Sequence, residues 1–453
     1  MTDLGLKRVL RLPAVSFIAI GFMIGGGVFV FTGIVLKIAG RGLPVAYALA
    51  VIPVFISMLP LAMLGSAMPT TGANYKYPCR MVSPALAFVG LWVYILASFW
   101  GQIPLYALSC AKYAGVFIPG VSLKLIAVII LTILYIINIL GVRLAAQVQG
   151  TLVIILISAL LLYSGKGLST LQPGFCTGIF DAGAGNLLLG TALLTFTYFG
   201  ANGIIELGGE IINPGRVIPR SYFIAFPVVA VVYVLVALST VNALSLEQLT
   251  SVDEPLIHTA GAVMGKFGAG FFIAGGAVLA LVTTLNALFL VGTKSLLIMV
   301  EDDLLPKFFG RLNNRFRTPH VLLTAIWVLS IAGMFSGLSL ETFASYAALG
   351  GLIIFLPIQI ASLRLPDLFP ERYENSEFRL TGFWLWFCPI VGILMVLFFG
   401  LVIIVDLKSP LKIGWFSLFI VSGILFYYLR RAQLLKRGIN LDNLKNKEDW
   451  GDE

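Results

Sequence analysis

Long apolar runs, separated by short polar segments, recur from one end of this chain to the other. A bilayer core of about 30 Å needs about 20 consecutive apolar residues in one helix. The pattern therefore predicts an all-α integral membrane protein with twelve transmembrane helices. The predicted spans are 13–36, 42–66, 84–117, 121–141, 147–165, 187–210, 221–244, 269–299, 319–337, 341–363, 382–405 and 411–431.

Composition and charge placement agree with this topology. Of the 453 residues, 59% are apolar and 11% are charged, whereas a soluble domain carries about 25% charged residues. The loops and termini on one side of the predicted topology hold 21 Lys and Arg residues, and those on the other side hold 8. This asymmetry predicts that both termini are cytoplasmic, in a multi-pass protein of the plasma membrane. Because the basic residues lie in short loops, the net charge of +9 does not indicate nucleic-acid binding.

The first span contains a cluster of glycines near its middle. Gly25, Gly26 and Gly27 are consecutive, and Gly21 precedes them by about one turn. Each glycine costs a helix about 1 kcal/mol relative to alanine, so we expect the helix to unwind here. Backbone amides freed at this depth can bind a carboxylate, and freed carbonyls can bind a cation. Close helix packing through Gly21 and Gly25 is the alternative interpretation.

The sixth span predicts a second interruption, at residues 199–203, where glycine, asparagine and aromatic residues cluster. Two broken helices five spans apart indicate two five-helix repeats of inverted topology with a site between them. The same span ends with Glu206, a deep carboxylate of the kind that is usually functional, and with Glu210, which is close enough to the cytoplasm to meet loop arginines. The predicted organisation is a cytoplasmic N-terminus at 1–12, repeats at 13–165 and 187–363, two additional helices at 382–431, and a cytoplasmic tail at 432–453.

Three motifs give the chain a family resemblance over roughly residues 10–430. The motifs are Gly21-x-x-x-Gly25-Gly26-Gly27-Val28-Phe29, Phe196-x-Tyr198-x-Gly200 followed by Gly209-Glu210-x-x-Asn213-Pro214-x-x-x-Ile218-Pro219, and Asn286 with Leu304-Leu305-Pro306 and Thr318-Pro319. With these motifs the chain resembles the amino acid–polyamine–organocation (APC) transporters, which share the fold of the bacterial leucine transporter.

The resemblance implies a central substrate site at the two breaks. Amides near the three consecutive glycines would hold a substrate carboxylate, and carbonyls near Gly21 and of Phe196 and Tyr198 would hold an ammonium group. Asn202 stands where some antiporters carry an acidic residue, so its neutrality argues against a proton-sensing carboxylate there. The implied substrate residues are Gly21, Ile24, Gly25, Gly26, Gly27, Phe196, Tyr198, Phe199, Gly200 and Asn202.

The resemblance also bears on the coupling ion. Leu156 falls where proton-coupled relatives often carry a lysine, and the eighth span reads Ala280-x-x-Thr283-Thr284, as in sodium-coupled relatives. Oxygens of these three residues, with the carbonyls of Gly21 and Ile24, would make five hard ligands for sodium. The alternative is that both threonines only bond back to their own helix.

These observations predict a secondary active transporter of small, neutral amino acids or related organic cations, with sodium symport as the leading hypothesis. Proton-coupled symport and amino acid or polyamine exchange, with Glu206 in a coupling or substrate role, are the alternatives. The spans contain no Cys/His group and no Gly-x-Ser-x-Gly motif, so we expect no enzyme and no cofactor beyond the coupling ion. The loop at 116–124 lacks the cysteine that links some APC members to a heavy chain, so we expect no such partner.

Overall fold

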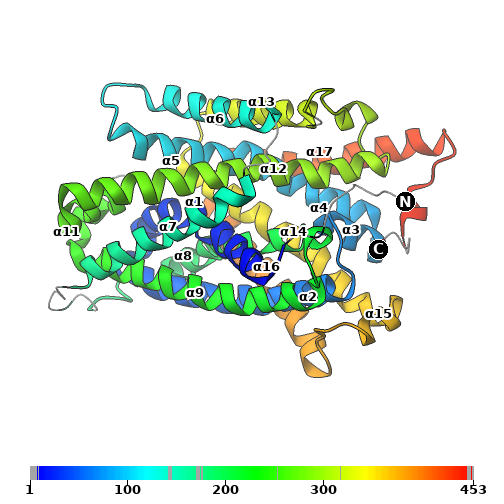
Figure 1. Cartoon of the computed structure of the whole chain (residues 1–453), viewed down its shortest axis with the longest axis horizontal. Coiled ribbons are helices and arrows are strands. Elements are labelled where there is room, and N and C mark those ends of the chain that lie inside the picture. The colour runs from blue at the N-terminus through cyan, green and yellow to red at the C-terminus, as the bar shows by residue number, and fades with distance from the viewer. Residues whose placement is uncertain are drawn as a thin grey trace.

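The computed structural model describes residues 8, 10–140, 145–169, 174, 177–252, 254–316, 318–445 and 450. The predicted N-terminus at 1–12 and tail at 432–453 therefore lie partly outside the described residues, as does Cys176. Figure 1 shows an elongated bundle whose long helices run mostly along its longest axis. In the part that the structure describes, β structure is limited to two isolated bridges, Leu10 with Ile211 and Thr71 with Leu207.

The helices follow the predicted apolar runs, with several short helices between them. Two π-helical turns (η2 and η5) and two 3₁₀ segments (η3 and η4) interrupt or follow longer helices. The bounds are α1 Leu12–Ala39, α2 Leu43–Ala67, α3 Ala73–Met81, α4 Pro84–Leu96, η2 Ala97–Gln102, α5 Ile103–Gly115, α6 Leu123–Leu140, α7 Ala145–Gly167, α8 Gly183–Tyr198, η3 Phe199–Ile204, η4 Gly208–Glu210, α9 Pro214–Ala243, α10 Leu246–Thr250, α11 Pro255–Phe271, η5 Phe272–Val278, α12 Leu279–Glu301, α13 His320–Met334, α14 Leu340–Leu368, α15 Pro370–Glu374, α16 Phe383–Leu407 and α17 Pro410–Leu435.

Many of these helices are suited to a bilayer. Within the described ranges, nine helical segments are long and apolar enough to cross a membrane, and the longest, Leu12–Ala67, contains both α1 and α2. Two shorter apolar helices, Val153–Gly167 and His320–Met334, lie at the fifth and ninth predicted spans. Large apolar side chains are exposed along α6, α16 and α17, as expected for surfaces that face lipid. The chain is thus a multi-pass helical membrane protein, and the number twelve stays a prediction.

The helical path is interrupted at both places that the glycines predicted. Gly25 has non-helical backbone angles inside α1, with φ −8° and ψ −140°. The sixth span is helical only to Tyr198, and η3 and η4 then carry the chain to the start of α9. The two interruptions are neighbours, because α1 packs against α8, η3, α9 and α12. The core of the bundle is built around this contact.

The helices α11 and α3 differ from expectation. Helix α11 begins at Pro255, before the predicted eighth span, and its backbone is non-helical at Gly265, with φ 66° and ψ 176°. The predicted start of the eighth span near 269 lies just after this kink. Helix α3 was not predicted, since it is short and polar, yet all nine of its residues are buried.

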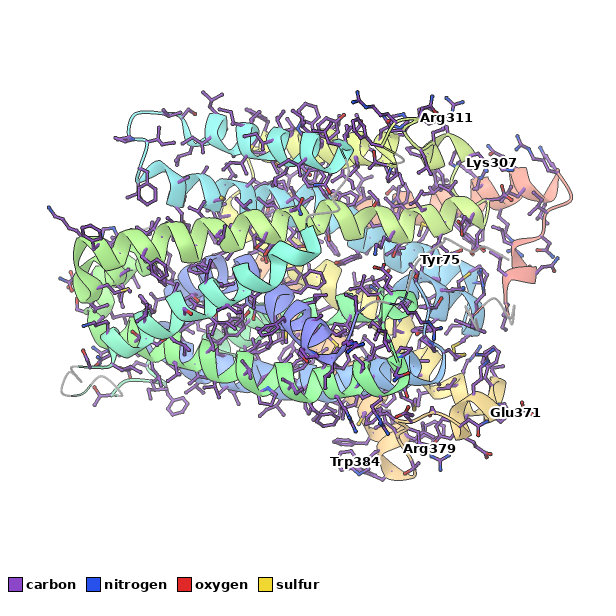
Figure 2. All side chains as sticks on the ribbon, in the orientation of Figure 1. Tyr75, Lys307, Arg311, Glu371, Arg379 and Trp384 are labelled. Atoms are coloured by element: carbon purple, nitrogen blue, oxygen red, sulfur yellow. The ribbon has the colours of Figure 1, made fainter. Side chains whose placement is uncertain are left out.

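The structure gathers several distant segments at one end of the bundle. Leu10 pairs with Ile211, and the ring of Trp450 stacks on Tyr77 of α3. Figure 2 shows Tyr75 of α3 at the same end as Lys307, Arg311, Glu371 and Arg379, which come from the loops with the most basic residues. This grouping agrees with termini and basic loops on one side of the membrane.

Candidate functional site

A cavity of about 110 Å³ lies where the two interrupted helices meet. Its walls come from the first and sixth spans, from the third span (α4, η2 and α5), and from α3, α12 and α14. The lining residues are Phe22, Met23, Asn74, Leu91, Tyr94, Ile95, Ser98, Phe99, Gln102, Tyr106, Phe196, Thr197, Phe199, Gly200, Asn202, Gly203, Thr284, Ala287, Leu288, Gly292, Ser295, Gly351, Ile354 and Phe355.

The structure brings one third of the expected site residues to this cavity. Those that line it are Phe196, Phe199, Gly200, Asn202 and Thr284. Those that do not are Gly21, Ile24, Gly25, Gly26, Gly27, Tyr198, Ala280, Thr283, Glu206 and Glu210. Tyr198 is directed away, since its hydroxyl donates a hydrogen bond of 3.1 Å to the carbonyl of Tyr47. The first span instead contributes Phe22 and Met23, which the glycine motif did not single out.

The glycine cluster makes the closest contact between α1 and α12. The amide of Gly26 donates to the Thr284 hydroxyl at 2.8 Å. A Cβ atom added at Gly25 would lie 2.2 Å from that hydroxyl oxygen, and one added at Gly26 would lie 2.6 Å from a methyl group of Leu281. The glycines are therefore needed for helix approach as well as for unwinding. Binding of a carboxylate by these amides stays a prediction, because in this structure the Gly26 amide donates its hydrogen bond to Thr284.

The two threonines of the eighth span bond to their own helix. Thr283 and Thr284 donate to the same acceptor, the carbonyl of Ala280, at 2.9 and 2.8 Å. Three of the five expected sodium ligands thus lie together, but the Thr284 oxygen also accepts the Gly26 amide. Leu156, at the position of the lysine in proton-coupled relatives, is buried.

Tyr233 of α9 links the two interrupted helices. Its buried hydroxyl donates to the carbonyl of Met23 in the first span and lies 3.4 Å from the carbonyl of Thr197 at the end of α8. Both acceptors belong to residues that line the cavity. The Tyr233 hydroxyl therefore satisfies backbone carbonyls that the breaks would otherwise leave without a hydrogen-bond donor.

We expect Tyr233→Phe to lower uptake about tenfold, because a buried carbonyl that loses its donor costs about 1–3 kcal/mol. The measurement is initial uptake rate together with thermal unfolding of the purified protein. Tyr222→Phe on the same helix is the matched control. Its buried hydroxyl has no hydrogen-bond partner among the described residues, so its removal should be neutral or stabilising. Equal effects of the two changes would contradict a linking role for Tyr233.

Glu206 is fully buried but does not line the cavity. Its carboxylate accepts the backbone amide of Asn74, near the start of α3, at 2.7 Å and the hydroxyl of Ser295 on α12 at 3.1 Å. A negative group at a helix N-terminus is favoured by the helix dipole. Glu206 thus joins α3, the sixth span and α12 at the inner edge of the cavity.

Glu210 has a different partner from the one expected. It forms an ion pair of 2.9 Å with Lys294 of α12, and both side chains are about one-fifth exposed. The loop arginines were the expected partners because they are near in sequence, whereas the fold brings a lysine from inside the eighth span.

The polar lining of the third span was missed by the sequence argument. Ser98 and Gln102 are four residues apart in an otherwise apolar run, and both are buried against the cavity. The spacing of these two polar residues, about one helical turn apart, was the signal in the sequence that could have identified this lining.

Comparison with known proteins decides the family. The model of the family described as amino acid permease matches residues 14–429. The chain belongs to the amino acid permease family.

The permease aligns along nearly its whole length with curated relatives. It is 24% identical to the branched-chain amino acid permease BcaP of Bacillus subtilis, over 94% of this chain and 93% of that protein. It is 26% identical to the methylthioribose transporter of Bacillus subtilis, with 95% of each chain covered. It is 25% identical to the vacuolar cationic amino acid transporter 4 of Arabidopsis thaliana, over 84% of this chain and 70% of the relative. The permease is therefore a membrane transporter of the APC superfamily and not an enzyme, and the relatives' names differ in substrate.

Proposed function

We propose that the permease carries small, neutral amino acids across the plasma membrane by alternating access, with the substrate bound in the cavity between the interrupted first and sixth spans. The observation that supports this most is that both interruptions meet at one cavity, lined by Phe22 and Met23 from one span and Gly200 and Gly203 from the other. Twelve spans, arranged as two inverted five-helix repeats plus two further helices, with both termini cytoplasmic, complete the proposal.

The chemistry of the cavity supports a small and neutral substrate. No Asp, Glu, Lys, Arg or His is found among the described residues that line it. Burying an unpaired charge is costly, so a charged substrate side chain would lack a counter-charge. Interrupted helices supply polar backbone for the substrate's carboxylate and ammonium groups. An engineered cavity of about 150 Å³ holds benzene, so a cavity of about 110 Å³ suits a small ligand.

Uptake of labelled amino acids into proteoliposomes tests this function. We expect saturable uptake of a small neutral amino acid, with competition by other neutral amino acids and little by lysine or glutamate. Absence of uptake for every amino acid in the panel, in the presence of sodium and of a proton gradient, would contradict the proposed function.

We further propose that sodium drives uptake, with the hydroxyls of Thr283 and Thr284 and the carbonyls of Ala280, Gly21 and Ile24 as ligands. The Ala280 carbonyl lies 2.9 and 2.8 Å from the two hydroxyls, so an ion that replaced these two hydrogen bonds could contact all three oxygens. A sodium ion that binds one conformer better shifts the balance of states, so sodium should tighten substrate binding, and substrate should tighten sodium binding by the same factor.

The double change Thr283→Ala, Thr284→Ala should remove the sodium dependence of uptake. Thr191→Ala is the matched control, because the Thr191 hydroxyl also bonds to its own helix, at 2.8 Å, in α8. Initial rates are measured in sodium and in choline. Unaltered uptake of the unmodified permease in choline would refute sodium coupling.

Proton coupling through Glu206 is the second candidate, and its position favours it. The carboxylate is completely buried, and the Asn74 amide and the Ser295 hydroxyl that donate hydrogen bonds to it are neutral. If this candidate is correct, uptake follows an imposed proton gradient, and Glu206→Gln loses gradient-driven uptake while retaining exchange of internal for external substrate. Loss of both activities would indicate a structural role instead.

A further inference from the structure

One wall of the cavity carries a row of polar side chains from the third span. Tyr94, Ser98, Gln102 and Tyr106 follow one another at intervals of four, and all four line the cavity. Along an α-helix of 3.6 residues per turn, such positions drift around the axis by about 40° at each step. The π-helical turn η2 adds a residue at Ala97–Gln102, which opposes this drift and keeps the row on one face. Such turns frequently mark functional sites.

Three amide side chains from different elements of this region carry unpartnered oxygens. They are Gln102 of η2, Asn202 of η3 and Asn74 of α3, each only 7% exposed. Their side-chain oxygens have no hydrogen-bond partner within the described part of the chain, and all three residues line the cavity. Buried polar atoms normally have partners, so this arrangement suits a ligand that donates hydrogen bonds.

The charge of the cavity wall also bears on the ligand. Glu206 lies nearby, but its oxygens accept from Asn74 and Ser295 and it does not line the cavity. Without a carboxylate in the wall, a donor that carries a full positive charge would be poorly compensated.

We propose that the permease selects amino acids whose uncharged side chain donates a hydrogen bond, a hydroxyl or a carboxamide, and that Ser98, Gln102 and Asn202 recognise that donor. This inference rests on the proposed function and narrows its substrate class. A site built to bond a substrate's donor discriminates against an analogue without it more strongly than an apolar pocket discriminates by size.

Isosteric substrate pairs test the proposal in proteoliposomes with the full-length permease. Threonine and valine have nearly the same shape, as do asparagine and leucine, and only the first of each pair donates a hydrogen bond from its side chain. We expect threonine and asparagine to compete for uptake of labelled serine at least about tenfold better than valine and leucine, the size of effect that one buried unpaired polar group produces. Lysine should compete weakly.

The variant Gln102→Met, similar in size to the original residue, should bring the threonine-to-valine ratio close to one, and Asn202→Leu should lower it. Ser109→Ala is the matched control, because Ser109 is buried in the same span but outside the cavity, and the ratio should not change. Measurable serine uptake with valine equal to threonine as competitor in the unmodified permease would overturn the specificity proposal alone. Absence of uptake of all amino acids would overturn the proposed function and, with it, this proposal.

Discussion

Gly200→Ala should abolish uptake, with at least a hundredfold loss of initial rate. A Cβ atom at this position would lie 2.2 Å from the carbonyl oxygen of Phe22, 2.4 Å from its carbonyl carbon and 2.8 Å from the amide nitrogen of Met23. All three atoms are backbone, so no side-chain rotation can relieve the overlap. Overpacking a well-packed contact typically costs about 1–3 kcal/mol, and here it would separate the two interrupted helices that form the cavity.

Gly185→Ala is the control for this change. Gly185 lies in α8, the helix that leads into η3 and Gly200, but it is exposed, and a Cβ atom there would meet no heavy atom within 4 Å. Alanine also favours the helix by about 1 kcal/mol, so we expect normal uptake and unchanged or higher thermal stability. Normal uptake by Gly200→Ala would contradict the close contact between Gly200 and the first span.

Asp302→Ala should lower the free energy of unfolding by about 3–5 kcal/mol, because it leaves the buried guanidinium of Arg80 without its carboxylate. Arg80 of α3 contacts both carboxylate oxygens of Asp302, which follows α12, at 2.8 and 3.0 Å. The side chains are only 1% and 5% exposed. The hydroxyl of Tyr75 also donates to Asp302, at 2.8 Å. This cluster joins α3 to the inner end of the eighth span, so its loss should also alter opening toward the cytoplasm.

Thermal unfolding of the purified variants in detergent measures this effect. The double change Arg80→Met, Asp302→Leu should recover much of the loss, because a buried ion pair can often be replaced by apolar residues. Arg216→Ala is the control. It breaks an ion pair with Glu377 that has the same 2.8 Å distance but is 58% and 50% exposed, and such pairs contribute about 1 kcal/mol or less. Similar losses for Asp302→Ala and Arg216→Ala would contradict the importance of burial.

The helices and their interruptions could be predicted because they depend on local properties of the chain. A bilayer requires every span to be a long apolar run, and such runs are visible without knowledge of their neighbours. The cost of glycine in a helix is also local, so Gly25 marked the break in α1 that the structure contains. The family resemblance followed from motifs at these breaks and was confirmed by the match over residues 14–429.

The contacts that complete the site could not be predicted in this way, because they depend on how distant segments pack. The bond between the amide of Gly26 and Thr284 joins residues 258 positions apart. Tyr233 reaches carbonyls of both interrupted helices from a third. Helix α3 was too short and polar to be recognised, although it supplies Asn74 to the cavity and to Glu206.

Sequence alone thus determined that this chain is a helical membrane transporter with two weakened helices, since solvation by lipid and helix propensity act residue by residue. Only the tertiary structure decided which polar groups face the cavity and which pair with one another. Glu210 shows the difference. Nearness in sequence favoured a loop arginine as its ion-pair partner, whereas the packing of the helices places Lys294 beside it. The role in selectivity proposed for the row from Tyr94 to Tyr106 depends on the fold, which places this row in the wall of the same cavity as Asn202.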